Sequence, residues 1–213
     1  MNKMNIVFLG DSVTEGAGAS VIENCYVNLV GKMLSCSVCN GGLGGTRIAR
    51  RKTWFDRHVY ELNFRLRLQV LPDTADYVFV FGGLNDQGHG DASIGEFDSR
   101  DEFTFNGALR LLIEDLSKKY GKEKIRFIIP FKWFGYNKKA PFVKEEVYEK
   151  DFVDALIKML EYYQIPYLDL FNGFLDAPLT EEPCEYFVDG IHPSDKGHFE
   201  IAKAICKFIE QNP

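Results

Sequence analysis

Four short blocks of polar residues and glycine in this sequence carry side chains that could perform nucleophilic catalysis. The first block is Gly10-Asp11-Ser12, which directly follows a short apolar run and carries a serine hydroxyl. Serine becomes a useful nucleophile only when a neighbouring base accepts its proton, so the rest of the chain must supply that base. Taken alone, Gly-Asp-Ser is more typical of a turn that caps a helix, so the other blocks decide its interpretation.

A candidate base lies near the C-terminus, in Asp189-Gly190-Ile191-His192-Pro193-Ser194. An aspartate three residues before a histidine in a tight loop can accept a hydrogen bond from the imidazole Nδ1–H. That bond fixes the tautomer and leaves Nε2 as the atom that accepts a proton. This block therefore predicts His192 as the base and Asp189 as the acid that orients it, although a single histidine is more often structural.

Two further blocks could stabilise negative charge on an oxygen atom. The glycine-rich stretch from Asn40 to Gly45 allows backbone N–H groups to approach a ligand closely, and it matches neither of the glycine-rich nucleotide-binding motifs. Asn85 follows the apolar run Tyr77–Phe81 and could direct its side-chain N–H toward an oxyanion. Each block alone is also typical of a turn, so the argument depends on their conjunction.

Together the four blocks resemble the GDSL-type esterases, also called SGNH hydrolases, a family named for a serine, a glycine, an asparagine and a histidine. The family's positions fall, in the family's order and over nearly the whole chain, on Gly10-Asp11-Ser12, on Asn40 with Gly45, on Gly83-Leu84-Asn85-Asp86, and on Asp189 with His192. Two residues depart from the family's pattern. Val13 replaces the leucine of the family name, and Gly44 stands where many relatives carry serine, which we expect to loosen the loop around Gly45.

The resemblance implies a serine esterase (an acylhydrolase) that cleaves short acyl esters, with acetyl groups on carbohydrate as the first expectation. Ser12 would attack the acyl carbonyl, His192 would act as base, and Asp189 would orient it. The oxyanion hole would consist of the backbone N–H groups of Ser12 and Gly45 and the side-chain amide of Asn85. Lysophospholipase or thioesterase activity, acyl transfer through the same acyl-enzyme, and a non-catalytic binding module remain alternatives.

Three other residues are candidates for contact with the substrate, namely Asp11, His89 and Trp133, although we also expect Asp11 to brace the nucleophile turn. His89 lies between Asp86 and Asp91, and these three side chains raise the possibility of a metal site. Ligands that glycines separate in a loop are poorly held, so we expect no metal and no other cofactor.

A basic cluster, Arg47, Arg50, Arg51 and Lys52, follows the second block. We interpret it as a solvated face, as charge runs usually are, rather than as a site for an acidic substrate. The aromatic segment Lys132–Tyr136 could line an acyl pocket, form a platform for a sugar, or simply cover the core.

Alternating apolar runs and amphipathic stretches predict the elements that position these blocks. The predicted strands are Asn5–Leu9, Ser35–Asn40, Tyr77–Phe81, Ile125–Pro130 and Pro166–Leu170, and the predicted helices are Ile22–Leu34, Thr53–Leu71, Phe103–Tyr120, Val143–Tyr163 and a last one capped by Ser194. This order predicts an α/β fold, a three-layer α/β/α sandwich with a central, mostly parallel five-stranded sheet of flavodoxin-like type. Gly82–Arg100, Phe131–Phe142 and Asn172–Pro193 are predicted to be irregular loops at one edge of this sheet.

The composition is that of one globular domain spanning residues 1–213. The formal charge of −6 disfavours a nucleic-acid partner, and no apolar run approaches the roughly 18 residues of a membrane span. The N-terminus lacks the apolar region of a signal peptide, and the five cysteines form no disulfide framework, so we expect a cytoplasmic protein whose partner is a small ester. Nothing in the sequence indicates its oligomeric state.

Overall fold

The computed structural model describes residues 3–53, 62–175 and 180–212. At its centre lies a sheet of five strands, β1 (Asn5–Gly10), β2 (Ser37–Gly42), β3 (Tyr77–Phe81), β4 (Ile125–Ile129) and β5 (Tyr167–Asp169). All neighbouring strands of this sheet pair in parallel, in the order β2-β1-β3-β4-β5. This is the flavodoxin-like order, so the predicted fold class is confirmed.

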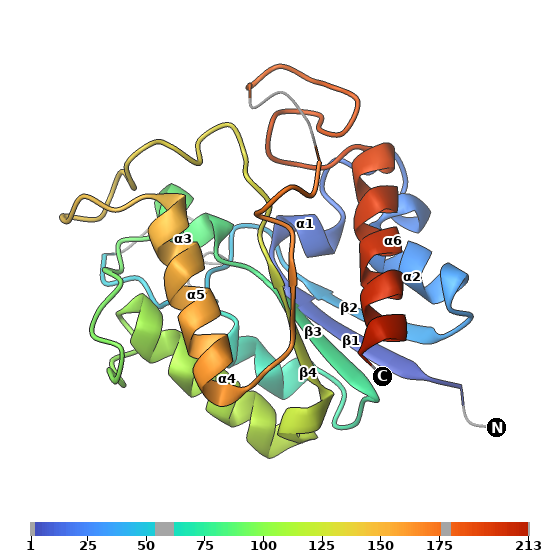
Figure 1. Ribbon diagram of the computed structural model, residues 1–213, viewed down its shortest axis with the longest axis horizontal. Helices are drawn as coiled ribbons and strands as arrows, with labels where there is room; N and C mark the ends of the chain where they lie inside the picture. The colour runs from blue at the N-terminus through green and yellow to red at the C-terminus, as the bar shows by residue number, and fades with distance from the viewer. Residues whose placement is uncertain (1–2, 54–61, 176–179, 213) are drawn as a thin grey trace.

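Helices cover both faces of the sheet and complete the three layers (Figure 1). α2 (Tyr26–Met33) and α6 (Asp195–Gln211) pack on one face, where the core includes Phe8 and Phe79. On the other face α4 (Phe105–Tyr120) and α5 (Glu149–Tyr163) pack over a core that includes Val7 and Val80. Successive strand residues alternate between the two cores, as the period of two in a strand requires. β3 is therefore apolar throughout, because both of its faces are buried.

Two predicted helices differ from the structure in their first turns. The stretch predicted as one helix over Ile22–Leu34 is a 3₁₀ helix, η1 (Ile22–Asn24), followed by α2. Cys25 separates them because its backbone is extended, with φ −60° and ψ 139°. The helix predicted from Val143 begins only at Glu149, where the Tyr148 backbone N–H donates to the carboxylate of Asp151 at 2.7 Å. Local capping therefore decides where each helix begins.

Short helices were the elements that periodicity did not reveal. The loop predicted over Gly82–Arg100 contains α3 (Leu84–His89). Within the stretch predicted to be helical over Thr53–Leu71, residues 54–61 lie outside the described residues, and Arg65–Val70 forms the 3₁₀ helix η3. A helix of one or two turns shows no apolar repeat, since one turn already spans 3.6 residues.

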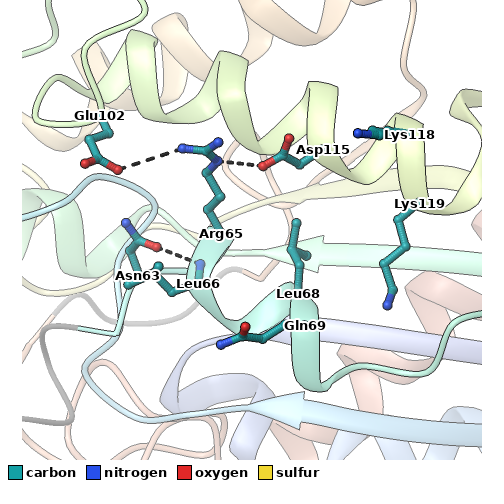
Figure 2. A pocket seen from close by; sticks show the side chains of 9 residues that line it. All are labelled: Asn63, Arg65, Leu66, Leu68, Gln69, Glu102, Asp115, Lys118 and Lys119. Carbon is teal, nitrogen blue, oxygen red and sulfur yellow. Dashed lines mark hydrogen bonds and ion pairs between the residues drawn. The ribbon is translucent and has the colours of Figure 1, made fainter.

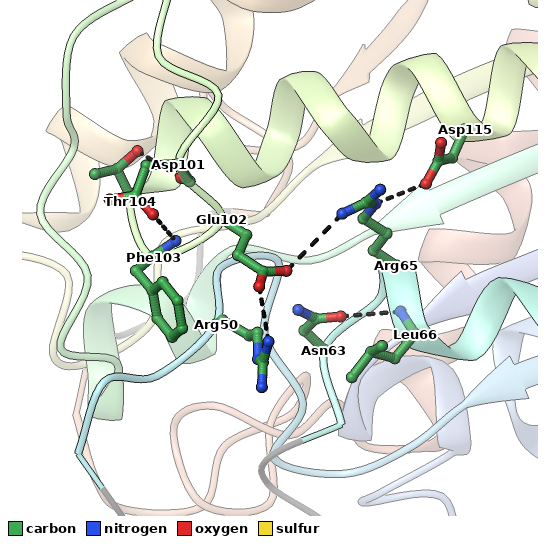
Figure 3. Close-up of polar contacts among 9 residues, drawn as sticks. All are labelled: Arg50, Asn63, Arg65, Leu66, Asp101, Glu102, Phe103, Thr104 and Asp115. Carbon is green, nitrogen blue, oxygen red and sulfur yellow. Dashed lines mark hydrogen bonds and ion pairs between the residues drawn. The ribbon is translucent and has the colours of Figure 1, made fainter.

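Charged side chains join η3 to α4 and to the loop that precedes it (Figure 3). Arg65 lies between Asp115 and Glu102, with nitrogen–oxygen distances of 2.6 and 3.8 Å, and Arg50 contacts Glu102 at 2.7 Å. The same α4 flank borders a hollow lined by Asn63, Arg65, Leu66, Leu68, Gln69, Glu102, Asp115, Lys118 and Lys119 (Figure 2). No residue of the four sequence blocks lines this hollow, so it is separate from them in space.

Only half of the basic cluster is the solvated face that we predicted, because Arg50 and Lys52 are exposed whereas Arg47 and the side chain of Arg51 are largely buried. Arg47 is only 2% exposed, and the side chain of Arg51 is 7% exposed. Arg51 donates to the carbonyl oxygen of His89 at 2.9 Å and lies over the ring of Phe142. The prediction failed for these two arginines because their guanidinium groups are buried in contact with neighbouring carbonyl, imidazole and aromatic groups.

The described part of the chain contains no helix long and apolar enough to cross a membrane. All five cysteines are free thiols, and Cys36 and Cys39 form no disulfide. The cytoplasmic location inferred from the cysteine content stays a prediction.

Candidate active site

The turn after β1 places Ser12 at the carboxyl edge of the sheet, at the start of α1 (Ser12–Glu15). β2 lies on one side of β1 and β3 on the other, which makes this the topological switch point where open α/β sheets bind ligands. Asp11 is the N-cap of α1, and its Oδ1 accepts a hydrogen bond from the Val13 N–H at 3.0 Å. Asp11 is 1% exposed, and this burial raises its pKa to about 7. Such a position suits the predicted brace but not the predicted contact with substrate.

Ser12, His192 and Asp189 form a hydrogen-bonded chain, although at least 176 residues lie between the serine and the other two in the sequence. The Ser12 Oγ lies 3.1 Å from His192 Nε2, and His192 Nδ1 lies 2.7 Å from Asp189 Oδ2. The second carboxylate oxygen, Oδ1, accepts the backbone N–H groups of Ile191 at 3.1 Å and of His192 at 2.7 Å. Burial opposes the negative charge of Asp189, but the hydrogen bonds from His192 and from Ile191 outweigh it and lower its pKa. A carboxylate so held fixes the imidazole with Nε2 toward the serine.

The loop that carries His192 is held from both sides. After it, the Ser194 Oγ caps α6 by accepting the Gly197 N–H at 3.3 Å. On the other side, the Phe134 backbone N–H donates to the Gly190 carbonyl oxygen at 3.2 Å. Trp133 precedes that contact, is partly buried, and lies close to Gly88 of α3. Trp133 is thus near both the histidine loop and α3, as a residue that lines the site would be.

The glycine-rich stretch begins within the end of β2 and continues into a tight loop beside Ser12. Gly45 has a φ of 74°, a conformation that glycine adopts without strain. The Gly44 N–H donates to Glu15 Oε2 at 2.9 Å and so ties the loop to α1, while the expected effect of Gly44 on the stiffness of the loop stays a prediction. Among the described residues, the backbone N–H groups of Ser12 and Gly45 meet no acceptor, as donors reserved for a ligand would.

Arg67 supports both strand ends, and sequence reasoning missed it. Its guanidinium donates to the carbonyl oxygens of Gly41 at 2.6 Å and Gly10 at 2.8 Å, and to Thr46 Oγ1 at 2.9 Å. Burial lowers its pKa to about 10, which leaves it charged at neutral pH. Because its acceptors are mostly main-chain oxygens, no pattern of side chains in the sequence could have identified it.

The third block forms α3, which carries Asn85 to the same edge. The Asn85 Nδ2 donates to the carbonyl oxygen of Thr46 at 2.9 Å, and its Oδ1 lies 2.9 Å from His89 Nε2. The other ring nitrogen of His89 lies 3.2 Å from Arg47 Nη1. His89 therefore uses both nitrogens within the protein, an arrangement that does not suit the predicted contact with substrate.

The two carboxylates of the metal hypothesis are used to hold backbone instead. Asp86 accepts the N–H groups of Ile48 at 3.0 Å and Ala49 at 2.8 Å. Asp91 accepts those of Lys52 at 3.0 Å and Thr53 at 2.8 Å. Across the described ranges, no group of three or more histidine, cysteine, aspartate or glutamate side chains is placed to hold a metal ion.

Comparison with known proteins identifies the family and the fold of the chain. The chain matches the profile of the GDSL-like Lipase/Acylhydrolase family over residues 8–198. Comparison with curated proteins gave no significant match. Among solved structures, a protein from Lactobacillus plantarum is 26% identical with a TM-score of 0.80, and the match covers 100% of this chain and 99% of that one.

Two further structures share the fold at lower identity. The lipase/acylhydrolase from Enterococcus faecalis is 22% identical with a TM-score of 0.66, and the match covers 98% of this chain and 96% of that one. A member of the lipolytic protein G-D-S-L family from Veillonella parvula is 16% identical with a TM-score of 0.68, covering 96% of this chain and 97% of that one. The resemblance seen in the sequence is confirmed, and the chain belongs to the GDSL-like lipase/acylhydrolase family of hydrolases.

Proposed function

We propose that this hydrolase is a serine esterase that cleaves short acyl esters through an acyl-enzyme on Ser12. The observation that carries the proposal is the chain of hydrogen bonds from Ser12 Oγ to His192 Nε2 at 3.1 Å and from His192 Nδ1 to Asp189 Oδ2 at 2.7 Å. A serine next to a base that a third group orients is the arrangement that nucleophilic catalysis requires.

In the first half-reaction, Ser12 Oγ bonds to the acyl carbon while its proton moves to His192 Nε2. The tetrahedral oxyanion would accept hydrogen bonds from the backbone N–H groups of Ser12 and Gly45 and from the second N–H of Asn85. As the intermediate collapses, the bond to the alcohol oxygen breaks and His192 returns the proton to that oxygen. Water then attacks the acyl-serine by the same route, which releases the acid and restores the free serine.

The proposed substrate is a small ester, with acetylated carbohydrate as the first class to examine. The formal charge of −6 supports a neutral or cationic small molecule over nucleic acid. Transfer of the acyl group to an alcohol acceptor would use the same intermediate, so product analysis with and without a sugar acceptor separates a transferase from a hydrolase.

The proposal is tested by activity and by labelling. The purified protein should hydrolyse p-nitrophenyl acetate, a fluorophosphonate should label Ser12, and Ser12→Ala should abolish both. A matched control is Ser37→Ala, which removes an exposed serine at the amino end of β2, at the opposite end of the sheet from the proposed nucleophile. Full esterase activity in folded Ser12→Ala would refute the proposal.

A further inference from the structure

The side-chain amide of Asn85 is held in one orientation by partners on both of its ends. Its Nδ2 donates to the Thr46 carbonyl oxygen at 2.9 Å, and its Oδ1 lies 2.9 Å from His89 Nε2. Asn85 and His89 are four residues apart on α3, a spacing that brings two side chains together on one face of a helix. An exchange of the amide oxygen and nitrogen would set two oxygens, Oδ1 and the Thr46 carbonyl, against each other.

This orientation holds only if His89 carries its proton on Nε2, and Arg47 enforces that tautomer. Arginine has donors and no acceptor, so the contact of 3.2 Å between Arg47 Nη1 and His89 Nδ1 requires Nδ1 to be the acceptor. Arg47 is 2% exposed and Arg51 donates to the His89 carbonyl oxygen at 2.9 Å. Burial, followed by the charges of Arg47 and Arg51, lowers the pKa of His89 to about 4 and keeps the imidazole neutral.

We infer that His89 is a positioning residue. Together with Arg47, it fixes the Asn85 amide so that one N–H donates to the Thr46 carbonyl oxygen and the other faces the oxyanion. The inference rests on the proposed function, because it assigns a role within the oxyanion hole of that same reaction. A hydrogen bond donated to Oδ1 also polarises the amide, so the N–H offered to the oxyanion becomes a stronger donor.

The inference predicts a specific pattern among variants of His89. His89→Leu should lower kcat by about 10- to 100-fold with little change in KM, because Asn85 would remain but its amide would no longer be held in one orientation. Asn85→Ala, which removes the donor itself, should cost roughly 10²- to 10³-fold in kcat. His89→Gln should recover much of the lost kcat, since its side-chain N–H reaches the position of Nε2, whereas His89→Asn is too short and should not.

A double-mutant cycle separates positioning from general damage. In the Asn85→Ala background, His89→Leu should have no further effect on kcat, because nothing remains for His89 to aim. The control is His198→Gln, a change at another buried histidine that bonds to Tyr26 and Ala17 rather than to Asn85. It should alter kcat by the same factor in both backgrounds. Equal losses for His89→Leu in both backgrounds would overturn the inference.

Nitrogen-15 NMR of the histidine rings in the wild-type protein tests the geometry without reference to turnover. At about pH 7, His89 should be neutral with its proton on Nε2, and a proton on Nδ1 would contradict the inference. Ser12→Ala is assayed beside these variants. If Ser12→Ala keeps wild-type activity, the proposed function fails; if it is inactive while His89→Leu keeps the wild-type kcat, only the positioning role fails.

Discussion

Replacing Asp189 by asparagine tests how the histidine loop controls the proton on His192. In the wild type, Asp189 Oδ1 accepts two backbone N–H groups and Oδ2 faces His192 Nδ1. The asparagine oxygen must keep accepting the two backbone donors, so its NH₂ group takes the place of Oδ2. A donor at that place forces His192 Nδ1 to become an acceptor and moves the ring proton to Nε2, which can then no longer accept the proton of Ser12.

The magnitude follows from this wrong tautomer. In Ser-His-Asp systems the same change lowers kcat by about 10⁴-fold, which corresponds to roughly 5 kcal/mol of transition-state stabilisation. The side chain of Asp189 is 47% exposed, and the variant keeps both backbone hydrogen bonds, so the free energy of unfolding should fall by only about 1 kcal/mol. KM should stay close to the wild-type value, since the carboxylate does not face the substrate.

The assay is steady-state hydrolysis of p-nitrophenyl acetate, with urea unfolding as the check on stability. Asp189→Ala is the informative companion, because it removes the acceptor without imposing a tautomer and should be no slower than Asp189→Asn. Asp195→Asn is the matched control, since Asp195 bonds to Ser20 and Asn24 and not to His192. A kcat of Asp189→Asn within tenfold of the wild type would refute the tautomer argument.

Two further predictions concern buried charges beneath the site. Burial raises the pKa of Asp11 from 3.8 to about 7, so its contribution to stability is lost as pH rises through that range. Asp11→Asn keeps an acceptor for Val13 and cannot ionise, so its stability relative to the wild type should rise by up to roughly 4 kcal/mol between about pH 4 and pH 8. Equal pH dependence of the two urea midpoints would contradict this. Arg67→Met leaves Gly41 and Thr46 without their buried donor and should destabilise the protein by about 2–4 kcal/mol in urea, whereas a loss below about 1 kcal/mol would show that these bonds contribute little.

The parts of the fold that follow from burial were predictable. β3 was predicted with its observed bounds because Tyr77–Phe81 is an unbroken apolar run, which marks a strand covered on both faces. α4 was predicted within two residues, because its apolar side chains repeat at helical spacing and Gly121 follows its end, whereas the cap at Thr104 was not recognised. α3 was not predicted because its residues are mostly polar and include Gly88, so no apolar repeat distinguishes it from a loop.

Sequence reasoning located the blocks of the site but not the groups that support them. Reaction chemistry restricts the residue types at Ser12, Asp189 and His192, so their types and their order along the chain are informative by themselves. Arg67 bonds mainly to carbonyl oxygens that every residue possesses, and no motif marks it. The pairing of Asn85 with His89 depends on α3 being a helix, because a spacing of four residues brings side chains together in a helix and not in a loop.

Trapping of the acyl-enzyme tests the central claim most directly. Protein mixed rapidly with p-nitrophenyl acetate is quenched in acid during turnover, digested, and examined by peptide mass spectrometry. The account predicts one acetyl group on the peptide that begins α1, located on Ser12, and none on that peptide in Ser12→Ala. Turnover of the ester with no acetyl group on Ser12 at any quench time would contradict the account. So would a Ser12→Ala variant that keeps its activity and carries an acetyl group on another residue.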